Sequence, residues 1–268
     1  CIYSQLKTCS SSEAAAMIEG VLRHCTDMQV QKQYVDTHGQ SEVAFAFSHL
    51  LGFDLMPRLK RIGAQKLARV EAKDSEKYPN LRSILARSID WELIAQQYDQ
   101  MIKYTTALRL GTAETASILR RFARPPVQHP TYKALSELGR AVKTIFLCHY
   151  LHDTKLRREI HEGLNVIESW NAVNDFIFYG RGGEFATNSE EAQEIGMLSL
   201  HLLQACLVYV NTLMIQDVMQ ESEWSTRLLA EDLRALSPLI HAHINPYGFF
   251  KLDMTQRIRL SSGLSINS

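Results

Sequence analysis

The sequence has few cysteines, and they form no pattern that would hold a scaffold together. Its 268 residues include five cysteines, which are odd in number and far apart, and no C-x-x-C pair occurs. This spacing argues against a disulfide framework and against a zinc site. It is typical of a protein from a reducing compartment, so we expect a cytoplasmic location.

Net charge and long apolar runs are missing as well. Lysine plus arginine and aspartate plus glutamate both number 29, so any binding of nucleic acid must rest on local basic patches. No unbroken apolar run reaches the roughly 18 residues of a membrane span. The most apolar stretch, residues 197–215, is interrupted by His201, Gln204 and Asn211. We therefore expect no membrane association, and no signal peptide is recognisable.

Two further features concern the chain start and nucleotide binding. The chain starts at Cys1 and not at a methionine, which we interpret as a cut end. A phosphate-binding Gly-x-x-x-x-Gly-Lys loop is absent, and the glycines at 180–183 are more typical of a helix end.

The residues that are present predict a mixed α/β chain that is mostly helical. Apolar residues make up 46%, enough for a core. Period-two alternation predicts a strand at 28–35, and short strands are expected at 1–6 and 67–70, with a strand or loop at 53–62. Serines before periodic segments predict helix starts. From residue 81 the pattern is helical almost to the end, and the expected helices are 14–24, 41–51, 91–108, 112–122, 131–151, 154–179, 189–220 and 223–236.

Asp36 is the first residue that could carry chemistry. It stands at the end of the predicted strand 28–35 and is followed by Thr37-His38-Gly39, a turn sequence. A strand end holds a carboxylate rigidly enough for a metal ion. An Asx-turn or a helix N-cap before Ser41 explains the same position, and position alone favours that simpler interpretation.

Glu168 is the second. At about 100° per residue, Val166, Trp170, Val173 and Ile177 share a stripe that we expect to be buried. Glu168 then lies on the polar face. Glu159 and Glu162 on the same predicted helix point away from it by about 180° and 120°, so one of the three at most can face a given site. Alone, Glu168 is best explained as a solvated helix glutamate, and Glu184 is a rival outside the helix.

The combination of motifs changes this assessment. Tyr34-Val35-Asp36-Thr37-His38-Gly39 is followed by Leu50-Leu51-Gly52-Phe53 and Pro57-Arg58, and much later by Gly163-Leu164-Asn165 with Glu168. From about residue 3 to residue 247, this series resembles the catalytic region of transposases of the Tn3 family, which move large bacterial transposons replicatively. We therefore treat the chain as the C-terminal part of such a catalytic region.

The resemblance implies a ribonuclease H-like DDE core whose two aspartates and one glutamate bind two Mg²⁺ or Mn²⁺ ions. The second aspartate corresponds to Asp36 and the glutamate to Glu168. Asp27 lies in a predicted turn and does not match the first aspartate, so we expect this chain to be inactive alone. The implied division is a partial core at 1–75, a helical insertion at 76–153, and the glutamate helix with a helical C-terminal region at 154–268.

The resemblance also implies partners and a reaction. The intact enzyme would cleave the 3′ ends of a transposon's inverted repeats and join them to target DNA, as a homodimer on nucleoid DNA in the bacterial cytoplasm. Arg58, Lys155, Arg157 and Arg158 are candidates for phosphate contacts, and His38 for a contact with DNA. An ordinary charged helix face explains the cations equally well, and capping of the turn explains His38.

Two other interpretations remain open. One is a catalytically inactive helical remnant of a transposase that binds DNA or dimerises. The other is an unrelated helical enzyme, which would have a closed pocket elsewhere, lined by other titratable residues. The distance between the carboxyl groups of Asp36 and Glu168 separates the three.

Overall fold

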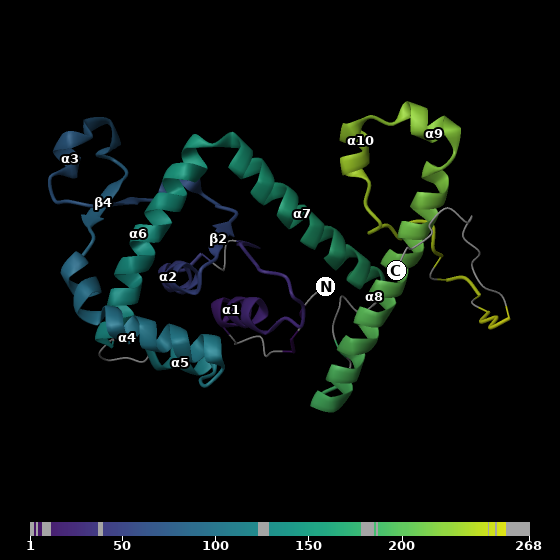
Figure 1. Ribbon diagram of the computed structural model, residues 1–268, viewed down its shortest axis with the longest axis horizontal. Helices are drawn as coiled ribbons and strands as arrows, with labels where there is room; N and C mark the ends of the chain where they lie inside the picture. Colours follow the sequence, from purple (N-terminus) through teal and green to yellow (C-terminus); the bar gives the residue numbers. More distant parts are fainter. Residues whose placement is uncertain are drawn as a thin grey trace. The chain divides into compact units, whose positions relative to one another are not determined.

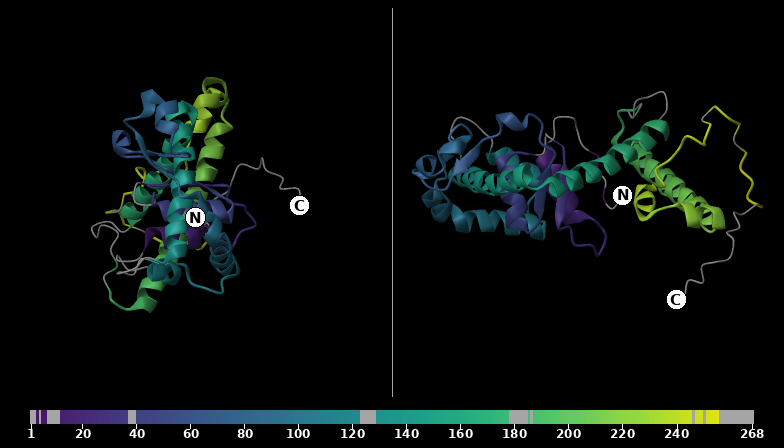
Figure 2. Two further views of the ribbon diagram at one scale, coloured as in Figure 1. Left: turned by 90° about the vertical axis from the view of Figure 1, so that its left-hand side faces the viewer. Right: turned by 90° about the horizontal axis from the view of Figure 1, so that it is seen from above.

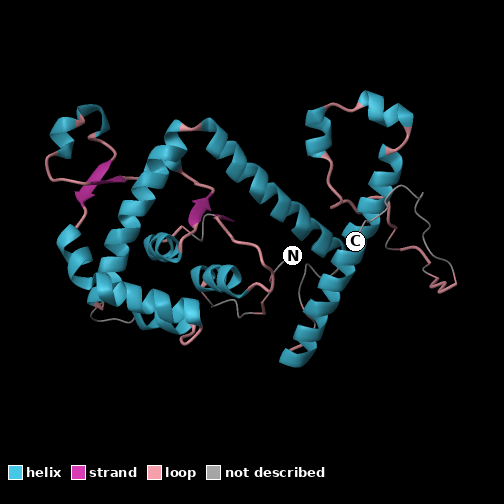
Figure 3. Ribbon diagram, viewed as in Figure 1, coloured by secondary structure: helices cyan, strands magenta, loops and turns pink. Residues whose placement is uncertain are grey.

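The structure is a computed structural model, and it describes residues 3, 5–6, 12–36, 40–122, 129–177, 185, 187–245, 247–249 and 251–255. The chain divides into two compact units, Cys1–Asn165 and Val166–Ser268. Both are mostly helical, with a few short strands in the first (Figure 3).

The first unit contains two small parallel strand pairs. In one, β1 (Lys32–Val35) pairs with β2 (Asp54–Pro57) in the register Lys32 to Asp54 and Val35 to Pro57. In the other, β3 (Leu67–Arg69) pairs with β4 (Leu85–Ser88). The helices of this unit are α1 (Glu13–Arg23), α2 (Glu42–Leu51), α3 (Asp74–Lys77), α4 (Trp91–Leu110), α5 (Thr115–Phe122), α6 (Pro130–His152) and the first part of α7 (Thr154–Ile177).

Local sequence signals set the ends of these helices. Ser12 and Ser41 cap α1 and α2 by accepting hydrogen bonds from the backbone N–H groups of Ala15 and Ala44. Gly52 and Gly111 end α2 and α4 in the left-handed conformation, at φ 87° and 71°. The helices predicted at 14–24, 41–51 and 91–108 are confirmed to within about two residues at each end.

Helix α2 is the centre of the first unit. It packs against α6, and α6 also lies beside α4 (Figures 1 and 2). The crossing of α2 and α6 is very close, because a Cβ at Gly139 would lie 1.7 Å from the carbonyl oxygen of Glu42. Phe45 and Phe47 of α2 are almost fully buried on two sides of the helix and contribute to two core clusters.

A buried carboxylate joins α6 to its neighbours. Glu137 is 4% exposed and accepts hydrogen bonds from Arg87, from Arg140 and from the backbone N–H of Asp90. Arg140 also makes a two-pronged ion pair with Glu42 at the start of α2. Every charge in this group has an opposite partner, which is the condition for burying it.

Four details of the sequence prediction are wrong. Residues 3, 5 and 6, which are the described part of the strand predicted at 1–6, lie outside any strand. Residues 85–88 form a strand, although the pattern from residue 81 onward predicted helix. The strand predicted at 28–35 is shorter, and β1 begins only at Lys32. The helix predicted at 223–236 is two short helices, α9 (Ser222–Arg227) and α10 (Ala230–Ala235), because Leu228 and Leu229 adopt extended backbone angles.

The second unit is built on α8 (Glu190–Met219), a 30-residue helix. By length and composition α8 is long and apolar enough to cross a membrane, and one such helix is weak evidence for a span. Much of its apolar surface faces outward, since Ile195, Leu198, Leu202 and Tyr209 are 58–66% exposed. The stripe predicted on α7 is only partly confirmed: Val173 is fully buried, whereas Val166 is 60% exposed.

Candidate functional site

Asp36 directly follows β1, as the sequence predicted. The backbone N–H of Arg58 donates to the carbonyl of Val35 at 3.0 Å, so the strand pair continues to this point. Side chains alternate along a strand, and therefore Lys32, Tyr34 and Asp36 project from the same face. The Asp36 side chain is 46% exposed and accessible from solvent.

Two cations flank the Asp36 carboxylate. Arg58 Nη2 lies 3.8 Å from Asp36 Oδ1, and Lys60 Nζ lies 3.8 Å from Asp36 Oδ2. Both follow β2, so the end of this parallel pair gathers one carboxylate and two basic groups. At these distances and exposures the ion pairs contribute little stability.

Helix α7 packs against β1 through one particular side. Ile160 and Leu164, one turn apart, are 1% and 5% exposed and belong to the core cluster that Tyr34 and Val35 pack against. Gly163 lies under the Tyr34 ring, where a Cβ would be 2.8 Å from Tyr34 Cδ2. Only glycine permits this close approach of helix to strand.

The hydroxyl of the same tyrosine reaches Glu159. Tyr34 Oη donates to Glu159 Oε1 at 2.7 Å, and Lys32 Nζ donates to the same oxygen at 2.6 Å. We call Lys32, Tyr34, Glu159 and Gly163 the β1–α7 clamp. It joins the strand that precedes Asp36 to the helix that carries Glu168.

The clamp changes the acidity of two of its members. Burial, with a smaller contribution from the neighbouring Glu159, raises the pKa of Tyr34 to about 12. The hydrogen bond from Lys32, followed by that from Tyr34, lowers the pKa of Glu159 below its usual value. The clamp thus favours a neutral phenol and a charged carboxylate at neutral pH.

Glu168 is exposed and lies on the continuous helix α7, in the part assigned to the second unit. Its position on the helix follows from the sequence register. Residues four apart lie nearly above one another, so Ile160, Leu164 and Glu168 share one ridge. Glu159 lies on the other flank of the buried side, about 180° from Glu168.

The other predicted basic residues differ in their surroundings. Arg157 donates to the carbonyls of Tyr150 and Leu151 at 2.5 and 3.0 Å, so its guanidinium caps the end of α6. Lys155 and Arg158 are exposed on the first turns of α7. The assignment of all three to DNA stays a prediction. His38 and Glu184 lie outside the described residues.

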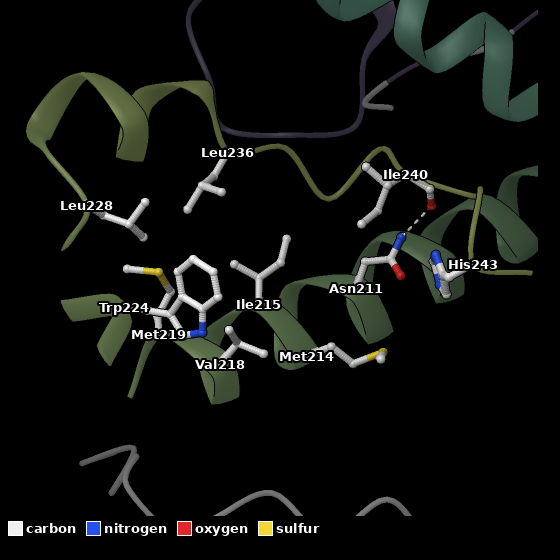
Figure 4. Close-up of a pocket in the computed structure, with 10 residues that line it drawn as sticks. All are labelled: Asn211, Met214, Ile215, Val218, Met219, Trp224, Leu228, Leu236, Ile240 and His243. Carbon is white, nitrogen blue, oxygen red and sulfur yellow. Dashed lines mark hydrogen bonds between the residues drawn. The ribbon is translucent and has the colours of Figure 1, made fainter. Parts of the chain in front are cut away.

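A separate pocket lies within the second unit (Figure 4). Its volume is about 430 Å³, and Met214, Ile215, Trp224 and Leu236 are among its apolar lining. Asn211 donates to the carbonyls of Pro238 and Ile240 at its edge. Of the ten residues that line it, only His243 is titratable, so this pocket gives little support to an unrelated acid–base enzyme.

The donor chemistry at Asp36 fits a hard divalent cation, because Mg²⁺ and Mn²⁺ prefer carboxylate oxygens. Within the described residues, no group of three or more histidine, cysteine, aspartate or glutamate side chains is placed to hold a metal ion. What fits a divalent cation here is therefore the type of ligand, a carboxylate that Asp36 presents at the end of β1.

Comparison with known proteins identifies the family. The model of the Tn3 transposase DDE domain matches residues 1–250, and the chain belongs to this family. Among individual relatives, the transposase for transposon Tn1546 of Enterococcus faecium is 30% identical over 260 residues, which cover 97% of this chain and 26% of that protein. The transposase for transposon Tn501 of Pseudomonas aeruginosa is 30% identical over 247 residues, or 92% of this chain and 25% of that protein. The chain thus spans about a quarter of the length of these relatives, and the predicted family is confirmed.

Sequence reasoning missed the clamp and the ion pair of Lys60 with Asp36. A usable signal was present for the clamp, because Lys32, Tyr34 and Asp36 repeat at period two. The three side chains share one face of the strand and each ends in a polar group, which indicated that another element of the chain contacts this face. Nothing local indicated that this partner is Glu159, 125 residues beyond Tyr34.

Proposed function

We propose that this chain is the C-terminal part of a DDE transposase catalytic core, which cleaves DNA at the 3′ ends of a transposon and joins them to target DNA. The observation that carries this proposal is Asp36 at the end of a parallel strand pair, flanked by Arg58 and Lys60, in a chain of the Tn3 transposase DDE domain family. An acid for a metal beside cations for phosphates is the combination that phosphodiester chemistry needs.

The spacing along strand and helix supports the pairing of Asp36 with Glu168. Lys32 contacts Glu159, and Tyr34 contacts both Glu159 and Gly163, so β1 and α7 run in the same direction at the clamp. Asp36 is two strand residues, roughly 6.7 Å, beyond Tyr34. Glu168 is five helical residues, roughly 7.5 Å, beyond Gly163. A straight continuation of α7 beyond Gly163 would therefore bring the two acids to the same level.

Each residue has a distinct role in this proposal. Asp36 and Glu168 would hold Mg²⁺ or Mn²⁺, with two ions in the complete site, and the metal supplies activation of the attacking oxygen and stabilisation of the leaving one. Arg58, with Lys60 beside it, would hold the scissile strand by its phosphates. Lys155, Arg157, Arg158 and His38 would extend the contact along the DNA.

We further propose a ribonuclease H-like arrangement for residues 1–75, with 76–153 as a helical insertion and 154–268 as the glutamate helix and a helical C-terminal region. With Asp36 and Glu168 as its two metal-binding acids, this chain alone would bind metal weakly and leave DNA uncut. We place its work on nucleoid DNA in the bacterial cytoplasm.

A homodimer is proposed for the intact enzyme. The exposed apolar residues Ile195, Leu198, Leu202 and Tyr209 of α8 are spaced by three, four and seven, which is the a/d pattern of paired helices. Between Glu194 and Asp217 the helix carries no charged side chain. A second copy of α8 would cover such a seam without burying a charge.

Metal binding tests the proposal. We expect Asp36→Asn and Glu168→Gln each to weaken Mn²⁺ binding by at least about tenfold, measured by electron paramagnetic resonance. The matched controls are Asp54→Asn, at the opposite end of the β1–β2 pair, and Glu162→Gln, on the same helix. Equal binding by all four variants would contradict the assignment. It would favour the second candidate, an inactive DNA-binding or dimerising remnant, which the exposed seam of α8 also fits.

A further inference from the structure

We infer that Glu159 is a positioning residue: through Tyr34 and Lys32 it fixes the level and rotation of α7 on the strand that ends at Asp36, and so sets where Glu168 stands. This inference rests on the proposed function, because it assigns the clamp a purpose in assembling the Asp36–Glu168 metal site. It concerns residues that do not touch the metal or the DNA themselves.

The hydrogen bonds of the clamp restrict how α7 can move on β1. A helix that lies on a strand can slide along its axis and rotate about it. Apolar contacts such as those of Ile160 and Leu164 are non-directional, so they oppose both motions only weakly. Two hydrogen bonds to one oxygen, at 2.6 and 2.7 Å, are directional. Because the donors are two residues apart on β1, they fix the level of Glu159 on the strand.

Tyr34 also fits closely against the helix. Its ring covers Gly163 while its hydroxyl reaches Glu159, one turn earlier. The side chain therefore spans one turn of α7 and opposes rotation of the helix about its axis. A larger residue at 163 would push α7 off the strand, since a Cβ there would lie 2.8 Å from the ring.

The ion pair of the clamp is expected to contribute little to the overall stability of the fold. The side chains of Lys32 and Glu159 are 41% and 40% exposed, and ion pairs of that exposure contribute little to folding. A contact that joins residues 127 apart in the sequence and contributes little stability is better explained by the placement of α7.

The test compares Glu159→Gln and Tyr34→Phe with Glu162→Gln, an exposed change on the same helix. Glu159→Gln keeps the size of the side chain, and Tyr34→Phe keeps the ring on Gly163, so both variants should fold. Two quantities are measured on the 268-residue chain: amide hydrogen exchange of α7, and the dissociation constant for Mn²⁺. We expect both clamp variants to speed exchange between residues 160 and 168 by about tenfold and to raise the Mn²⁺ dissociation constant by about tenfold, with neither change in the control.

Each other outcome overturns the inference in a recognisable way. Unchanged exchange in both clamp variants would show that Glu159 does not hold α7. Faster exchange with unchanged Mn²⁺ affinity would leave the clamp a purely structural contact. A wild-type chain with a protected α7 and no Mn²⁺ binding would refute the proposed function, and the purpose of the clamp with it. Gly163→Ala is the second test, and it should reproduce the faster exchange by steric displacement.

Discussion

Tyr34 and Glu159 are 125 residues apart in the sequence, and the tyrosine hydroxyl donates to the glutamate carboxylate at 2.7 Å. The bond joins the strand that ends at Asp36 to the helix that carries Glu168. In a chain of the Tn3 transposase DDE domain family, this contact connects the two elements on which the proposed metal-binding acids stand.

The pKa of Tyr34 depends on the burial of its side chain and, to a smaller extent, on this contact. Its folded value, about 12, lies above the ordinary value near 10, so the neutral phenol is the favoured form. The contribution of the neutral Tyr34 to the stability of the folded state is fully present below about pH 10, and it is lost as the pH rises toward 12. We expect Glu159→Gln to lower the pKa of Tyr34 toward its ordinary value, because the charged acceptor is removed. A titration followed by phenolate absorbance measures the pKa of Tyr34, with Tyr34→Phe as the subtraction control. An unchanged pKa in Glu159→Gln would refute the contact.

The cations around Asp36 should act on DNA through phosphates. We expect Arg58→Ala and Lys60→Ala each to weaken binding of duplex DNA irrespective of its sequence and to reduce the salt slope by about one. Binding isotherms at several salt concentrations measure the slope. Double variants that retain the full slope would exclude this strand end from the DNA path.

Arg157 provides a contrast within the same set of predicted residues. Its guanidinium already binds the carbonyls of Tyr150 and Leu151 at the end of α6. Arg157→Ala should therefore lower the thermal midpoint by a few degrees, and Arg158→Ala should not. If the two variants instead differ only in DNA affinity, the capping role of Arg157 is wrong.

The crossing of α2 and α6 should tolerate no side chain at Gly139. A Cβ there would lie 1.7 Å from the carbonyl oxygen of Glu42, which is backbone and cannot move aside alone. We expect Gly139→Ala to destabilise the fold by at least about 3 kcal/mol in urea unfolding. Gly63→Ala is the control, because its Cβ would meet nothing within 4 Å.

The apolar seam of α8 predicts that the chain forms a dimer. If a second copy covers it, light scattering should show a dimer that Leu202→Glu converts to a monomer. Leu110→Glu, at an equally exposed leucine at the end of α4, should leave the dimer intact. A wild-type monomer at tens of micromolar, or a dimer that resists Leu202→Glu, would assign the seam to another partner.

The sequence predicted those parts of the fold that are determined by neighbouring residues, and it missed those that depend on tertiary packing. Ser41 before α2 and Gly52 after it are local signals, and the helix predicted at 41–51 agrees with α2 to within one residue. The strand β4 was missed because Leu-Ala-Arg-Ser shows no alternation, and its pairing with β3 is a tertiary effect.

The candidate site follows the same rule. The place of Asp36 at the end of β1 was predictable from period-two alternation and the turn that follows. The role of Arg157 was not, because its partners are the last carbonyls of the preceding helix. The partnership of Tyr34 with Glu159 depends on how a helix 125 residues away packs, which no local pattern encodes.

The most direct test of the central claim is the distance between the carboxyl groups of Asp36 and Glu168 in a crystal structure of the protein soaked with Mn²⁺. Metal ions of a two-metal site lie about 4 Å apart, so two acids that share it must come within about 8 Å of one another. We predict that separation, with metal density beside Asp36. A separation beyond about 15 Å in a well-ordered crystal would contradict the assignment of these two residues to one catalytic site.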